Sequence, residues 1–257
     1  METPASFGWF HLMWVAIAFL ALIPLLRDPK VQSEDHVRRV VLMTAIIVII
    51  LEVYKQINYS FSYEDGIVFD YQWYAFPFHF CSTPMYIGLL DGLIKKGKLH
   101  DSLCAYLATY AIFAGSAVMV YPNDVFIETI GINIQTMICH GSMITIGIYL
   151  FATGHVKLEH KTILKAMPVF AVTVGMAAVM NEIAYWAGLL ETETFNMFFI
   201  SRHCDPSLLV YSEVQKVVPF PGCLIIYILG FTAAAYIMLL LGMGVSKFLR
   251  KKTPVAV

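Results

Sequence analysis

The stretch from residue 75 to residue 90, AFPFHFCSTPMYIGLL, places a cysteine in the first turns of an apolar segment. Cys81 suits nucleophilic chemistry, because free N–H groups at a helix N-terminus favour a thiolate and can hold an oxyanion. His140, which lies in another apolar segment, is a candidate for the base that removes the thiol proton. This pair predicts acyl transfer through a thioester on Cys81.

His79 lies two positions before Cys81. On a regular helix the two side chains would point about 200° apart, so both can face one cavity only if the first turn is distorted. Pro77 and Pro84 provide a reason for such a distortion, because proline removes a backbone hydrogen bond and restricts the residue before it.

The chain has five cysteines, and their spacing matches no CxxC metal-binding pattern. Cys104 and Cys139 are interpreted as small packing residues. Cys204 and Cys223 are able to pair if they face an oxidising compartment, a question that the sequence leaves open.

The elements that position these residues are expected to be membrane-spanning helices. The 257 residues are 59% hydrophobic and 14% charged, with a mean hydropathy of +0.71, whereas about a quarter of the residues of soluble domains are charged. Seven apolar segments each approach the ~20 residues that a spanning helix needs. They are residues 9–26, 37–57, 77–94, 102–121, 130–153, 162–188 and 220–246. The sequence therefore predicts an all-α bundle of seven transmembrane helices, formed by residues 1–257 as a single domain.

The basic residues predict the orientation of this bundle. Most of them follow the first, third and fifth apolar segments or lie in the C-terminal tail, and the opposite side holds only Lys55, Arg202 and Lys216. Because Lys and Arg are retained on the cytoplasmic side, the N-terminus is expected outside and the C-terminus in the cytoplasm. The last outer loop, about residues 189–219, is too long for a simple connection and is expected to fold partly over the bundle.

Several polar side chains fall at one depth in the predicted membrane. Counting ~1.5 Å per residue from the cytoplasmic ends places them roughly 20 to 24 Å into a core of ~30 Å. They are Glu52, Cys81, His140 and Asn181, with Glu182 just beyond. Ionisable groups at such a depth are costly, so each is a candidate for a functional role.

Glu52 and Lys55 are three residues apart and can neutralise each other on one helix face. A structural ion pair is therefore preferred over a catalytic role for these two residues. Asn133, Thr136 and His140 recur at helical spacing in an otherwise apolar segment, and such a stripe should face the interior of the bundle.

The order and depth of these residues resemble the YwaF / transmembrane protein 164 family over nearly the whole chain. The likeness rests on PFHFC with Pro77, His79 and Cys81, on His140, Glu52, Lys55 and Asn181, on Asn196 in FNMFF, and on PFP at Pro219 and Pro221. The resemblance implies a multi-span helical fold. For the eukaryotic branch it also implies an acyltransferase that moves fatty acyl chains between phospholipids and makes ether phosphatidylethanolamines. That branch uses an acylated cysteine and a histidine, which match Cys81 and His140.

The residues and the resemblance together predict a phospholipid acyltransferase of an integral membrane, either a bacterial plasma membrane or a eukaryotic endomembrane. Cys81 is expected to act as nucleophile and His140 as base and then acid. The residues expected to orient the histidine or to bind the head group are His79, Asn181, Glu182, Glu52, Lys55 and Asn196. The expected substrates are phospholipid and lysophospholipid, with no metal, soluble cofactor or nucleic acid taking part.

Two other functions stay open at this point. The polar residues Glu52, Lys55 and His140 would also suit a protein that binds or transports a lipid or a small solute. His79 and His140 would suit the axial ligands of a haem. A retinal protein is excluded, because residues 220–246 contain no lysine that could form a Schiff base.

Overall fold

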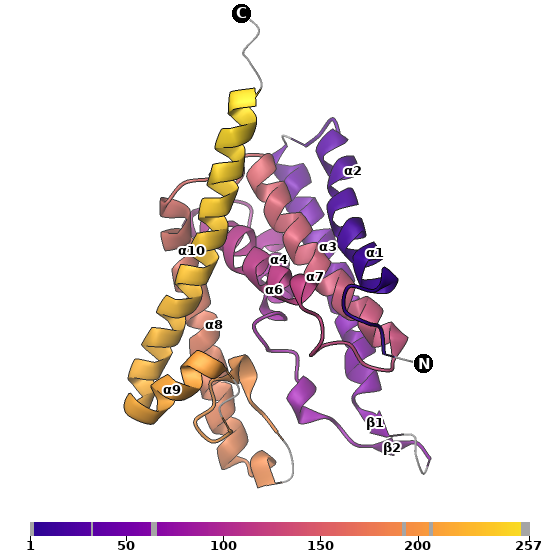
Figure 1. Cartoon of the computed structure of the whole chain (residues 1–257), viewed down its shortest axis with the longest axis vertical. Coiled ribbons are helices and arrows are strands. Elements are labelled where there is room, and N and C mark those ends of the chain that lie inside the picture. The colour runs from indigo at the N-terminus through magenta and orange to yellow at the C-terminus, as the bar shows by residue number, and fades with distance from the viewer. Residues whose placement is uncertain (1–2, 32, 63–65, 192–193, 206–207, 253–257) are drawn as a thin grey trace, which may run out of the picture.

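The computed structural model describes residues 3–31, 33–62, 66–191, 194–205 and 208–252. The fold is a bundle of helices with one small hairpin (Figure 1). The elements are α1 (Trp9–Leu20), α2 (Leu22–Arg27), α3 (Glu34–Asn58), β1 (Phe61–Ser62), β2 (Val68–Phe69), α4 (Thr83–Leu93), α5 (Lys98–Tyr106), α6 (Ile112–Val120), α7 (Ile130–Ala152), α8 (Lys161–Trp186), α9 (Leu209–Val217) and α10 (Phe220–Lys252). A π-helical segment, Leu107–Ala111, joins α5 to α6. The hairpin and α9 lie at one end of the bundle, and the last turns of α10 project at the other (Figure 1).

Six helical segments of the described chain are long and apolar enough to cross a membrane. They are Trp9–Arg27, Glu34–Asn58, Lys98–Val120, Ile130–Ala152, Lys161–Trp186 and Phe220–Phe248. The prediction of an all-α membrane bundle is thereby confirmed. The predicted span 77–94 is not among the six, because its helix α4 has only 11 residues and is therefore about 17 Å long. The count of seven spans and the orientation of the termini stay predictions.

Helix α4 begins six residues later than the apolar pattern predicts, at Thr83 instead of Pro77. The N–H groups of Ser82 and Thr83 both donate to the carbonyl oxygen of His79, which forms a turn before the helix. Pro84 follows in the first helical turn, where its missing N–H costs nothing. The distortion expected around Cys81 is therefore present, and Cys81 lies in the turn rather than in the helix.

Small residues bring the central helices close together. Helix α4 packs on α3 and helix α6 packs on α7. A Cβ atom on Gly92 of α4 would lie 2.6 Å from the Cβ of Leu42, and one on Gly115 of α6 would lie 2.6 Å from the carbonyl oxygen of His140. Neither helix could approach its partner this closely with a larger residue at these positions.

The described part of the loop between α8 and α9 enters the bundle, as its length predicted. Met197, Phe198 and Ile200 are each fully buried. The ring of Phe198 packs against Phe170 of α8, and its carbonyl oxygen accepts a hydrogen bond from the Tyr227 hydroxyl of α10 at 2.9 Å. The loop therefore forms part of the core at the end of the bundle that carries the hairpin.

Candidate functional site

Cys81 lies half-buried in the turn that precedes α4. Its carbonyl oxygen is 3.9 Å from the sulfur of Cys139 on α7. Cys139 directly precedes His140, so the turn that carries Cys81 contacts the same stretch of α7 that carries the histidine. Cys139 thus packs against the backbone of Cys81, in agreement with the packing role expected for it.

His140 is buried, and its ring nitrogen Nδ1 lies 2.7 Å from the carbonyl oxygen of Thr136. Because a carbonyl oxygen can only accept, Nδ1 carries a proton, and in the neutral imidazole the lone pair is on Nε2. Nε2 is buried and has no hydrogen-bond partner among the described residues. The neutral form of His140 therefore presents a free lone pair, which a general base requires.

The carboxylate of Glu52 on α3 is the centre of a buried polar cluster. It accepts hydrogen bonds from Lys55 at 3.0 Å, from Gln56 at 2.7 Å and from Gln135 of α7 at 2.9 Å. The ion pair predicted between Glu52 and Lys55 is thus present. These bonds compensate the desolvation of the carboxylate and link α3 to α7.

The same cluster extends to the segment before α4. The side-chain amide of Gln56 also donates to the carbonyl oxygen of Ala75 at 2.9 Å, and the hydroxyl of Tyr71 donates to Gln56 Oε1 at 2.5 Å. Burial, and then the charge of Glu52, raise the pKa of Tyr71, so this phenol keeps its proton and remains a donor. The backbone that leads into Cys81 is therefore tied to α3.

Lys55 lies close enough to the predicted catalytic residues Cys81 and His140 for its charge to act on both. Its ammonium group interacts electrostatically with Cys81 and with His140. The structure thus gathers Glu52, Lys55, Cys81 and His140 in one region between α3, α7 and the turn before α4. Their chemical roles stay predictions.

His79 contacts the segment before α4 and the loop between α8 and α9. Its Nε2 lies 2.9 Å from the carbonyl oxygen of Tyr74, and its ring centroid is 5.2 Å from that of Phe199. Its other ring nitrogen, Nδ1, has no hydrogen-bond partner among the described residues. A bond from one ring nitrogen to a carbonyl is common in histidines that bind a metal through the other, so these contacts leave the haem alternative open.

Asn181, Asn196 and Glu182 bind the loop between α8 and α9. Asn181 accepts from the Met197 N–H at 2.8 Å and donates to the Met197 carbonyl oxygen at 3.0 Å. Asn196 accepts from the N–H of Ser201 at 2.9 Å. Glu182 accepts two bonds of 2.8 Å from Arg202 and lies 3.2 Å from His203. The part predicted for these three residues in binding a head group stays a prediction.

Cys204 and Cys223 are not joined, and each thiol points to a different carbonyl oxygen. The sulfur of Cys204 is 3.5 Å from the carbonyl oxygen of Phe195, and the sulfur of Cys223 is 3.1 Å from the carbonyl oxygen of Val218. Each of the two cysteines therefore contacts a different segment of the chain.

Replacing Asn181 by alanine is expected to loosen the loop between α8 and α9. The substitution leaves the buried N–H of Met197 unpaired and removes one of the two bonds to its carbonyl oxygen, which also accepts from the Ile200 N–H. The free energy of unfolding should therefore fall by about 2 kcal/mol. Unfolding of the purified protein in mixed detergent micelles measures this loss. The exposed Asn123→Ala variant should lose less than about 1 kcal/mol, and equal losses in the two variants would contradict the prediction.

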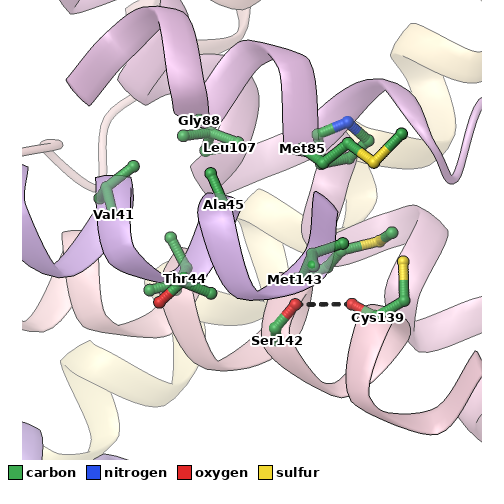
Figure 2. Close-up of a pocket in the computed structure, with 12 residues that line it drawn as sticks. Val41, Thr44, Ala45, Met85, Gly88, Leu107, Cys139, Ser142 and Met143 are labelled. Carbon is green, nitrogen blue, oxygen red and sulfur yellow. Dashed lines mark hydrogen bonds between the residues drawn. The ribbon is translucent and has the colours of Figure 1, made fainter. Parts of the chain in front are cut away.

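Two adjoining apolar spaces lie beside this site. A cavity of about 30 Å³ reaches Cys139, Met85 and Pro84, and a groove of about 220 Å³ lies between α1, α3 and α7. Figure 2 shows the residues that line the cavity, among them Cys139 and Ser142 of α7, Ala45 of α3 and Met85 of α4. The two spaces share the lining residues Thr44, Val48, Ser142 and Ile146. An apolar region therefore extends from the α1 side of the bundle to the vicinity of Cys139.

Sequence reasoning missed Gln56 and Gln135, whose side-chain amides donate hydrogen bonds to Glu52. Gln135 lies inside an apolar helix, and this property alone was a signal that its side chain has a buried partner. The predicted stripe on α7 was only partly informative. Asn133 is buried but binds the backbone of Ile127, at 2.9 and 2.7 Å, and not the polar cluster.

A bundle of membrane-length helices with charged and nucleophilic side chains in its interior defines an integral membrane protein with a buried polar site. The family model of the TMEM164 family matches residues 6–243, so the chain belongs to that family. No curated protein and no solved structure matched the chain significantly. The resemblance drawn from the sequence is thereby confirmed at the level of the family.

Proposed function

We propose that this protein is a membrane-embedded transacylase that moves a fatty acyl chain from a phospholipid to a lysophospholipid through a thioester on Cys81. The single observation that carries the proposal is the buried Nε2 of His140, which has a lone pair and no described partner. A buried nitrogen without a hydrogen-bond partner lowers the stability of the protein. A donor from the substrate or from the Cys81 thiol would provide that partner.

The reaction uses only the two residues and the lipids. His140 Nε2 accepts the proton of the Cys81 thiol, and the thiolate attacks the ester carbonyl of the donor phospholipid. When the carbon–oxygen bond breaks, the lysophospholipid leaves as an alcohol with the proton from His140. The hydroxyl of a second lysophospholipid then gives its proton to His140 and attacks the thioester. The thiolate leaves and recovers the proton, so the enzyme returns to its starting state.

The surroundings of Cys81 support a lipid substrate. The groove of about 220 Å³ that adjoins the small cavity beside Cys139 is lined almost entirely by apolar side chains, which suit part of an alkyl chain. The N–H groups of Ser82 and Thr83 already bind the His79 carbonyl, so they are not available to an oxyanion. Lys55, whose charge acts on Cys81, is a cationic candidate to stabilise the developing negative charge.

A trapped acyl-enzyme tests the proposal. The purified protein is incubated with a phospholipid that carries a labelled acyl chain, and the protein is analysed by mass spectrometry before and after treatment with neutral hydroxylamine. We expect the label on the peptide that contains Cys81 and its release by hydroxylamine, because this reagent cleaves thioesters. A protein that binds or transports lipid would carry no covalent label, and that result would exclude the thioester.

The His140→Gln variant is expected to transfer acyl chains about 100-fold more slowly, because glutamine cannot accept the thiol proton. The change is measured as the initial rate of label transfer between phospholipid and lysophospholipid. His11→Gln is the matched control, since that histidine is also buried but uses Nε2 to contact the Met119 carbonyl oxygen at 2.8 Å. Equal rates in the His140→Gln and wild-type proteins would exclude His140 as the base.

A further inference from the structure

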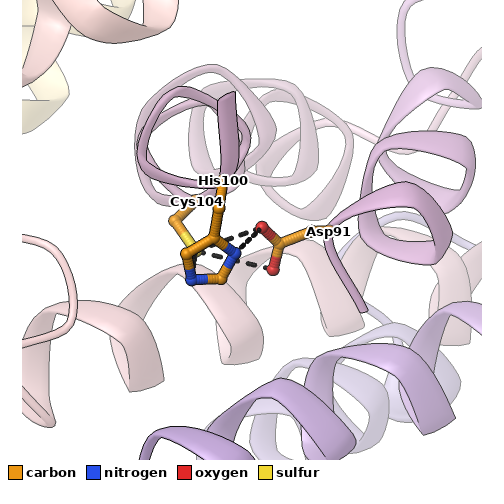
Figure 3. A group of neighbouring side chains, drawn as sticks. All are labelled: Asp91, His100 and Cys104. Carbon is orange, nitrogen blue, oxygen red and sulfur yellow. Dashed lines mark hydrogen bonds and ion pairs between the residues drawn. The ribbon is translucent and has the colours of Figure 1, made fainter. Parts of the chain in front are cut away.

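A second cluster of reactive side chains lies at the end of α4 that is distant from Cys81. Asp91 projects from α4, and His100 and Cys104 project from α5 toward it (Figure 3). Thr83 and Asp91 are separated by about 12 Å along α4, so this cluster is distinct from the proposed acyl-transfer site. His100 and Cys104 are four residues apart and therefore share one face of α5.

Asp91 is completely buried, although a carboxylate is among the groups that are most costly to bury. Its oxygen Oδ1 lies 2.8 Å from His100 Nδ1, and its two oxygens lie 3.4 and 3.5 Å from the sulfur of Cys104. The contact with His100 is short and forms an ion pair, although its angle departs from that of a regular hydrogen bond.

The three side chains have the geometry and the chemistry of a zinc ligand set. Each offers one ligand atom, and these atoms all lie within 4.8 Å of one another. Zinc binds sulfur at about 2.3 Å and nitrogen or oxygen at about 2.0–2.2 Å, so tetrahedral ligands lie about 3.3–3.6 Å apart. The sulfur of Cys104 lies 3.4 Å from Asp91 Oδ1, which is within this range. With Nδ1 as the ligand atom of His100, its 2.8 Å contact with Asp91 Oδ1 would have to lengthen by about half an ångström.

The charges also balance. A thiolate and a carboxylate together neutralise one divalent cation, so the complex of Zn²⁺ with Cys104, Asp91 and neutral His100 has no net charge to bury. Without the metal, a histidine and a weak thiol donor are the partners that the described part of the chain offers to compensate the desolvation of the carboxylate. We propose that Asp91, His100 and Cys104 bind one Zn²⁺ ion, with water as the fourth ligand, and that the ion joins α4 to α5.

Metal binding is tested on the full-length protein in detergent, without a histidine tag. The protein is stripped with a chelator, loaded with Zn²⁺, dialysed and analysed by inductively coupled plasma mass spectrometry. We expect about one zinc per chain. Loading with Co²⁺ instead should produce the charge-transfer absorption of a cobalt thiolate, and absence of both the bound zinc and this absorption in the wild-type protein would overturn the proposal.

Two cysteine variants locate the ion. Cys104→Ser, which is nearly isosteric, should weaken Zn²⁺ binding by at least about 100-fold and abolish the cobalt thiolate absorption. Cys139→Ala, which removes another buried thiol, should leave both unchanged. Retention of the thiolate absorption in Cys104→Ser would place the metal elsewhere. Neither readout depends on acyl transfer, so failure of this proposal and failure of the proposed function are distinguishable.

Discussion

The Cys81→Ala variant is expected to insert into the membrane and fold but to lose acyl transfer by about 10³-fold or more, because removal of a covalent nucleophile leaves only the contribution of binding. Cys81 makes no described side-chain hydrogen bond to another element, and its contact with α7 uses its backbone carbonyl. Alanine therefore preserves the packing of the turn. The measurement is the initial rate of acyl exchange between labelled phospholipid and unlabelled lysophospholipid.

Cys139→Ala is the matched control for this experiment. Its thiol is buried and lies 3.9 Å from the Cys81 carbonyl oxygen, so both variants remove a sulfur from the same region. We expect the control to keep a rate within about threefold of that of the wild-type protein. Full activity in Cys81→Ala, or an acyl label on Cys139 instead of Cys81, would refute the assignment of the nucleophile.

The largest effect on stability is expected for Glu52→Ala, which should lower the free energy of unfolding by about 3 kcal/mol or more. The substitution removes the acceptor for Lys55, Gln56 and Gln135 at once, and it leaves the half-buried ammonium group of Lys55 without its counter-charge. Unfolding in mixed detergent micelles measures this loss. The expected loss of stability is large because Glu52 is buried, with a side chain that is only 7% exposed.

An exposed ion pair of the same spacing provides the control. Glu213 and Lys216 on α9 are also three residues apart, but their side chains are 70% and 64% exposed. Glu213→Ala should therefore cost less than about 1 kcal/mol. If Glu52→Ala cost no more than this control, the buried cluster would not be what holds α3 against α7.

The cluster around Glu52 also restrains the turn that carries Cys81. Gln56 binds Glu52 and the carbonyl oxygen of Ala75, six residues before Cys81. On the other side of Cys81, the Thr83 hydroxyl lies 2.6 Å from that of Tyr106 on α5. The turn is thus restrained at both ends by side chains of regular helices, which is the arrangement that a precisely positioned site requires.

The membrane class, the all-α fold and the membership of the TMEM164 family could all be predicted from the sequence. The reason is that these properties depend on local patterns. A spanning helix satisfies its own backbone hydrogen bonds, so a run of about 20 apolar residues is sufficient evidence for it. The ion pair of Glu52 and Lys55 was equally local, because three positions along a helix bring two side chains together.

Contacts between residues that are distant in the sequence could not be predicted and are known from the tertiary structure alone. Cys81 and Cys139 are 58 positions apart, and Glu52 and Gln135 are 83 positions apart, so no helical period relates the members of either pair. Their contact depends on how closely α3, α4 and α7 pack. The same holds for Asp91 and Cys104, which belong to two helices separated by a turn. The late start of α4 at Thr83 also depends on a tertiary contact. The Thr83 hydroxyl lies 2.6 Å from that of Tyr106 on α5 and also donates to the nearby Phe80 carbonyl oxygen, so it stabilises a turn where the apolar pattern alone predicts helix.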